Sequence, residues 1–137
     1  MKIIEQEEVR KLLQPKDCIQ LMAEALKGLE SGEYAQPARL ITVMPNTAKF
    51  GFMPAYVGDY FGAKVISAFA PNMGTKYPSH IGYVMLFESA HSTVAGMIEA
   101  GSITEIRTGA VSAAATDLLA RKDSHKLALI GAGAQAR

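Results

Sequence analysis

A glycine-rich turn near the end of the chain has the spacing of a phosphate-binding motif. Residues 127–130 predict a buried strand that runs directly into Gly131-x-Gly133-x-x-Ala136. In a dinucleotide-binding unit, the first glycine allows a tight turn, the second lets the backbone approach a pyrophosphate, and a small third residue lets helix and strand pack closely. The helix that follows offers free N–H groups and a positive dipole end to the phosphates. An ordinary packing turn rich in Ala and Gly has the same pattern. Other motifs are therefore needed to distinguish phosphate binding from packing.

Arg107 is a second candidate for a role in ligand binding. The stretch SITEIRTGAVSAAATDLLARK predicts a helix capped by Ser102 or Thr104, with Arg107 in its first turn. A cation in that turn opposes the helix dipole and gains from a nearby anion, which favours a binding role. The alternative is a solvated arginine paired with Glu105 or Asp123. The spacing alone supports both interpretations equally.

Cys18, His91 and His125 add no further chemistry. Cys18 is the only cysteine and lies in a helical pattern without a nearby histidine, which favours a packed residue over a nucleophile and excludes an internal disulfide framework. His91 and His125 lie in predicted turns, and no Cys or carboxylate stands at ligand spacing from them. We therefore predict no metal site.

The composition indicates one globular domain that binds small molecules. The chain has 137 residues, of which 49% are hydrophobic and 20% charged. Its formal charge of +1 gives no electrostatic reason to expect nucleic acid or an anionic membrane as a partner. The N-terminus is too charged for a secretory signal, and no apolar run reaches the ~18 residues of a membrane span. We expect a cytoplasmic protein.

The hydrophobic pattern predicts two helices, then a sheet, then the helix that carries Arg107. A short helix over residues 7–13 precedes a longer one that ends at Ser31-Gly32, with Ile19, Met22, Leu26 and Leu29 on its core face. Runs rich in β-branched and aromatic residues predict successive antiparallel strands over residues 39–44, 50–57, 63–69, 83–87 and 93–98. The last two are joined by a hairpin-like connection. A polar linker, residues 121–126, is the predicted domain boundary.

Several stretches in this order resemble the ornithine cyclodeaminase/mu-crystallin family. They are Arg39, FMPAYVGDYFGAKVISAF, PSHIGYVMLFE, ITEIRTGAVSAAAT and LALIGAGAQAR. The resemblance implies an α/β (α+β) fold in which an N-terminal antiparallel sheet with helices, residues 1–121, forms a substrate-binding and dimerisation domain. Residues 127–137 would be the first strand and turn of a truncated Rossmann domain. The chain looks like less than half of a family member, so we expect it to be weak or inactive as an enzyme by itself, with its last ~10 residues mobile or repacked.

The same resemblance implies the site residues. Arg39, Lys64 and Arg107 would hold the α-carboxylate of the substrate, and Lys64 would also be catalytic. The implied cofactor is NAD or NADP, and the residues implied to bind it are Ser79, His80, Arg107, Thr108, Gly131, Gly133, Ala134 and Gln135. As alternatives, Lys64 is a strand lysine facing water, and His80 is a hydrogen-bonded structural histidine.

The resemblance implies an NAD(P)-dependent oxidoreductase of the ketimine reductase or amino acid dehydrogenase type, acting as a homodimer on a small imino or amino acid. The alternatives are an ornithine cyclodeaminase, which releases ammonia, and a non-catalytic binding protein like mu-crystallin. Family cyclodeaminases carry a glutamate two residues before a Met-Pro pair, to hold the distal amine. Gly51 has that place before Met53 and Pro54 here, which argues against cyclodeamination.

Overall fold

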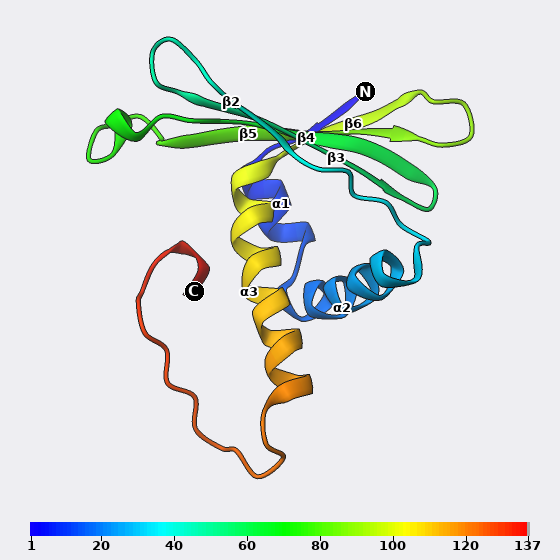
Figure 1. The fold of residues 1–137 in the computed structure, drawn as a ribbon, viewed down its shortest axis with the longest axis vertical. Helices are drawn as coiled ribbons and strands as arrows, with labels where there is room; N and C mark the ends of the chain where they lie inside the picture. The colour runs from blue at the N-terminus through cyan, green and yellow to red at the C-terminus, as the bar shows by residue number, and fades with distance from the viewer. Residues whose placement is uncertain (137) are drawn as a thin grey trace.

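The computed structural model describes residues 1–136 and shows a six-stranded sheet with the three helices of that range on one side (Figure 1). The helices are α1 (Gln6–Leu12), α2 (Pro15–Ser31) and α3 (Ala100–Leu119). The strands are β1 (Lys2–Ile4), β2 (Leu40–Val43), β3 (Lys49–Val57), β4 (Tyr60–Ala68), β5 (His80–Glu88) and β6 (Val94–Glu99). Two 3-10 turns, η1 (Ala70–Asn72) and η2 (Ala134–Ala136), complete the order.

The sheet has the strand order β1-β6-β5-β4-β3-β2. All five predicted strands, β2 to β6, are confirmed, and consecutive strands among them pair antiparallel. The strand β1 was not predicted; it pairs parallel with β6 and forms that edge of the sheet. The mixed α/β architecture agrees with the predicted class.

The second helix begins and ends at residues that suit helix termini. Pro15 is its first helical residue, where a missing N–H is harmless, and Gly32 ends it with a φ of 80°. The predicted core face of this helix is wrong in its second half, because Leu26 is 51% exposed and Leu29 is 36% exposed. The helix packs against α3, where Cys18 is buried, and not against the sheet. Space is therefore left between α2 and the strands.

The third helix lies under the middle of the sheet and starts earlier than predicted. Its N-cap is Glu99, whose carboxylate accepts hydrogen bonds from the N–H groups of Gly101 at 2.5 Å and Ser102 at 2.8 Å. The prediction of Ser102 or Thr104 as the cap is wrong, because Glu99 supplies a better acceptor one residue before the helix. Arg107 consequently lies two turns into the helix. The positive end of the helix dipole acts mainly within the first turn, so it does not oppose the charge of Arg107 as predicted.

After α3 the chain is extended and turns back towards the helix (Figure 1). Residues 127–130 form no strand, and Ile130 is 100% exposed. The predicted buried strand is therefore wrong for this structure, because none of the six strands lies beside the segment to share backbone hydrogen bonds. The segment ends instead in η2, which packs against α3. This packing agrees with the expectation that the last residues repack.

The sheet face that points away from the helices is apolar and uncovered. Side chains alternate along each strand, so the residues facing away from α3 can be assigned from the register. Large apolar side chains on this face are 40–63% exposed: Ile3, Leu40, Phe50, Phe52 and Ile81. Phe61 and Phe87 stack on the same face, with ring centroids 5.3 Å apart.

Candidate functional site

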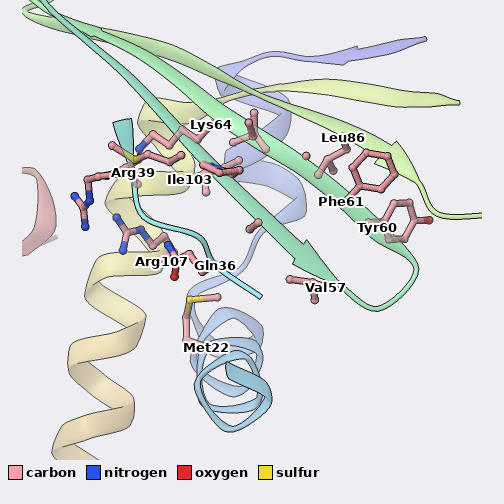
Figure 2. A pocket seen from close by; sticks show the side chains of 17 residues that line it. Met22, Gln36, Arg39, Val57, Tyr60, Phe61, Lys64, Leu86, Ile103 and Arg107 are labelled. Atoms are coloured by element: carbon pink, nitrogen blue, oxygen red, sulfur yellow. The ribbon is translucent and has the colours of Figure 1, made fainter. Parts of the chain in front are cut away.

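The three cations predicted to hold a carboxylate line one cavity of about 420 Å³ (Figure 2). Arg39 precedes β2, Lys64 lies in the middle of β4, and Arg107 lies on α3. Strand alternation turns Lys64 towards the helices, and the space between α2 and the sheet gives the cavity its room. Residues from three distant parts of the sequence therefore converge, as the site prediction requires.

Lys64 is held in place by a short chain of hydrogen bonds. Its Nζ donates to Thr104 Oγ1 at 2.5 Å, and Thr104 Oγ1 donates to the carbonyl oxygen of Ala100 at 2.6 Å. Partial burial, and then the nearby Arg107 guanidinium, lower the pKa of Lys64 from its ordinary value, while the Glu99 carboxylate acts in the opposite direction. An ammonium group has three donors, so two remain for a ligand.

Arg107 does not take part in either ion pair considered from the sequence. Glu105 accepts a hydrogen bond from the Arg10 guanidinium, and Asp123 lies 3.8 Å from Arg121. Within residues 1–136, no carboxylate pairs with Arg39 or Arg107. A cavity wall with three cations and no acidic residue in the described range attracts an anion, and a carboxylate matches the planar fork of an arginine.

A second cavity of about 590 Å³ lies on the other side of Lys64. It brings together Ser79 and His80, at the start of β5, with Ala134 and Gln135 of η2. Ser79 Oγ lies 3.0 Å from His80 Nδ1. Lys64 and Thr104 line both cavities, so their hydrogen bond lies at the boundary between them.

The other predicted cofactor residues are not brought into this second cavity. Arg107 lines only the first cavity, and Thr108, Gly131 and Gly133 line neither. The Thr108 hydroxyl is buried and has no hydrogen-bond partner among residues 1–136. Gly131 has a φ of 100°, a conformation that favours glycine. The roles of these residues in binding a cofactor stay predictions.

Thr104 was predicted only as a helix cap, and its contact with Lys64 was not predicted. The available signal was spacing, because Thr104 and Arg107 stand three residues apart and such residues share one helix face. Glu99 was missed as well. A carboxylate immediately before a helix rich in small residues was the signal for its capping role.

None of the residues that line the first cavity within the described range is acidic. The Cβ of any residue at Gly51 would lie 2.8 Å from Ile66 Cγ1, so the sheet packs tightly there. Glu88, at the end of β5, also does not line this cavity, and its carboxylate accepts hydrogen bonds from the N–H groups of His91 and Thr93 in the β5–β6 turn. Those bonds lower the pKa of Glu88.

Residues 1–136 contain neither a metal-ligand cluster nor a helix that could span a membrane. No group of three or more His, Cys, Asp or Glu side chains is arranged to hold a metal ion. None of the helices in this range has the length and apolar character needed to cross a membrane.

Comparison with known proteins assigns the chain to a family. The model of the ornithine cyclodeaminase/mu-crystallin family matches residues 1–137, and the chain belongs to this family. Ketimine reductase mu-crystallin of Mus musculus is 35% identical over 118 residues, which is 84% of this chain and 37% of that protein.

Two solved structures show the same fold. An archaeal alanine dehydrogenase dimer with bound NAD superimposes with a TM-score of 0.91 at 27% identity, covering 98% of this chain and 42% of the other. Thermococcus litoralis Delta(1)-pyrroline-2-carboxylate reductase, in complex with NADH and L-proline, gives a TM-score of 0.89 at 32% identity, covering 99% and 43%. The chain therefore spans less than half the length of these relatives.

Proposed function

We propose that this chain forms the substrate-binding part of an NAD(P)-dependent oxidoreductase of the ketimine reductase or amino acid dehydrogenase type. The observation that carries the proposal is the convergence of Arg39, Lys64 and Arg107 on one cavity. The relatives named above include a ketimine reductase, a pyrroline-2-carboxylate reductase and an alanine dehydrogenase, all of which supports nicotinamide chemistry on a small imino or amino acid.

The two arginines would bind and orient the substrate carboxylate, since each presents donors that match its two oxygens. Lys64 would act at the reacting end. One of its protons is used by Thr104, and the other two can reach the carboxylate and the imine nitrogen. In reduction, this ammonium would hold the proton that the imine nitrogen gains.

The second cavity fits the nicotinamide end of a cofactor. Its volume lies within the range of about 300–1,000 Å³ that small-molecule sites have, and Ser79, His80 and Gln135 provide polar groups in its wall. A bound reduced nicotinamide would supply hydride to the imine carbon. Because Lys64 lines both cavities, the substrate and the nicotinamide would meet beside its ammonium group.

Cyclodeamination of ornithine is the alternative within the family. It requires recognition of a distal ammonium group, and the described cavity wall offers three cations and no carboxylate. This arrangement favours substrates that carry a single carboxylate and no second amine.

The natural protein should be assayed with Delta(1)-pyrroline-2-carboxylate and reduced nicotinamide, and separately with ornithine and NAD. We expect consumption of the reduced cofactor with the imine and no ammonia from ornithine. Ammonia release from ornithine without net change in the cofactor would replace this proposal by cyclodeamination. Binding of imino acids without turnover would favour a binding protein instead.

We also propose that the uncovered sheet face pairs with a second copy of the chain. Phe50 and Phe52 lie there, 41% and 40% exposed, and such apolar patches mark interfaces. In sedimentation equilibrium we expect a dimer that Phe52→Lys dissociates. The matched control is Val43→Lys, since Val43 is an exposed residue whose side chain points to the opposite face. A monomeric natural protein would refute the pairing.

A further inference from the structure

The segment between α2 and β2 is attached to β3 at both of its ends. At its start, Ala35 and Tyr56 exchange backbone hydrogen bonds of 3.0 and 2.8 Å. At its end, Leu40 pairs with Phe52 as the first residue of β2. The chain advances five residues from Ala35 to Leu40, whereas β3 advances four between their partners. Residues 36–39, here named the strap, therefore contain one residue more than regular pairing with β3 would need.

This extra residue turns Gln36 into the cavity that holds the three cations. Side chains alternate along a strand, so continuing the register of β2 would place Gln36 opposite Tyr56, facing away from the helices. Ala35 takes that place instead, and an extra residue in one strand of a pair changes the face to which the residues beyond it point. Gln36 and Arg39, three residues apart, accordingly line the same cavity. Pro37 between them has no N–H to donate to β3, which favours this departure from regular pairing.

The backbone at the start of the strap is fixed by packing against the end of α2. The N–H of Tyr34 donates to the carbonyl oxygen of Gly28 at 2.9 Å, and the Tyr34 ring covers Gly28 so closely that a Cβ there would lie 2.3 Å from it. Gly32, with a φ of 80°, allows the chain to reverse between the two. Gln36 therefore follows closely after an anchored residue. Its own side chain is exposed, so a ligand in the cavity can reach it.

Gln36 brings a hydrogen-bond acceptor to a group of side chains that only donate. Figure 2 shows Gln36 on the side of the cavity where Arg39 and Arg107 lie. Guanidinium and ammonium groups donate hydrogen bonds but accept none. Thr104 Oγ1 already accepts from Lys64 and donates to a backbone carbonyl oxygen of α3. Among the described side chains at this end of the cavity, the amide oxygen of Gln36 is the acceptor left for a ligand.

A substrate whose carboxylate is held by the cations brings the nitrogen on its second carbon to the same end of the cavity. In a 2-amino acid or a protonated 2-imino acid, this nitrogen carries positive charge and N–H donors, which need an acceptor beside three cations. We propose that Gln36 is a substrate-binding residue whose amide oxygen accepts a hydrogen bond from this N–H. The proposal rests on the proposed function for the carboxylate, and it adds the residue that distinguishes a nitrogen-bearing acid from the same acid without nitrogen.

The test compares two ligands that differ only in the 2-amino group, L-alanine and propanoate. Their dissociation constants are measured by calorimetry at neutral pH, so the test does not depend on turnover. Gln36→Met keeps an unbranched side chain of similar length and removes the amide. Water competes for an exposed acceptor, so the effect should lie at the low end of the range for hydrogen bonds to charged groups, and alanine should bind about 10-fold more weakly. Propanoate has no N–H to lose and should stay within about twofold.

Two further variants locate the effect at the amide oxygen. Gln36→Glu replaces the amide by a carboxylate, which repels the carboxylate of both ligands and attracts the ammonium group of alanine alone. Alanine should therefore gain about 10-fold in affinity relative to propanoate. Gln20→Met makes the first substitution at an exposed glutamine of α2 outside the cavity, and it should change neither affinity.

The outcomes separate the role of Gln36 from the proposed function. A Gln36→Met variant that binds alanine as tightly as the natural protein does, or that loses affinity for both ligands equally, would overturn the role of Gln36 and leave the carboxylate site standing. If that variant does not fold, an unchanged ratio of the two affinities in Gln36→Glu would overturn it in the same way. A natural protein that binds neither ligand would overturn the carboxylate site itself, and the proposed function with it.

Discussion

Replacing Lys64 by methionine should weaken ligand binding and stabilise the fold at the same time. The substitution removes one of three cations from the cavity and keeps an unbranched side chain of similar length. Lys64 lies opposite Val84 on β5, which lines the same cavity, so the new side chain meets an apolar neighbour. Thr104 keeps its hydrogen bond to the Ala100 carbonyl oxygen.

The effect on stability follows from the pKa of Lys64. Burial and then Arg107 lower this pKa from its ordinary value of 10.5, so the folded state binds fewer protons than the unfolded state between the lowered pKa and 10.5. Stability therefore rises with pH through that window and falls as the pH drops through the folded-state pKa. At any pH below the folded-state pKa, Lys64 is charged and its full unfavourable contribution to stability is present, so Lys64→Met should raise the Tm there.

The effect on binding has the opposite sign. A hydrogen bond to a charged group contributes about 1.5–3 kcal/mol, so the Kd for a small carboxylate should rise about 10- to 150-fold. Thermal unfolding at neutral and alkaline pH, with calorimetry of propanoate binding, measures both effects. Lys49→Met, at an exposed lysine outside the cavity, is the control. A lower Tm in Lys64→Met, or an unchanged Kd, would refute the reasoning.

Three further substitutions test the contacts around this site. Thr104→Val removes the acceptor from Lys64 and should lower the pKa of that lysine further, as followed by NMR of its ε-carbon, whereas Thr104→Ser should restore the pKa. Glu99→Ala removes the cap of α3 and should lower the free energy of unfolding in urea by about 1 kcal/mol. Gly28→Ala would place a Cβ 2.3 Å from the Tyr34 ring and should destabilise the fold by about 1–3 kcal/mol in the same assay, so an unchanged unfolding midpoint would contradict the packing.

Local patterns predicted most of the sheet. Runs such as residues 50–57 contain the β-branched and aromatic residues that half-buried strands favour, and Gly58, with a φ of 54°, allows the turn to β4. The three residues of β1 have no such signal, because they stand beside the charged stretch that begins α1. Only pairing with β6, far away in sequence, makes them a strand.

Predictions that depended on contacts between distant segments of the chain were less successful. Leu26 has helical spacing with Met22, but α2 packs on α3 at a position that leaves Leu26 exposed. Residues 127–130 have the composition of a buried strand, yet composition does not provide the neighbouring strand that such a segment needs. The three cations were brought together by resemblance to a family, and their roles stay predictions. The hydrogen bond between Lys64 and Thr104 could not be predicted, because it joins residues 40 positions apart.

The boundary between the two cavities has a thermodynamic consequence. Because Lys64 and Thr104 belong to both walls, a ligand on one side that draws a proton of Lys64 towards itself changes the groups offered to the other side. Affinities for the two ligands are then linked, and by reciprocity each must change the affinity of the other by the same factor. An anion beside Lys64 also favours its protonated form, so uptake of a proton would accompany the binding of a carboxylate wherever the free site is partly deprotonated.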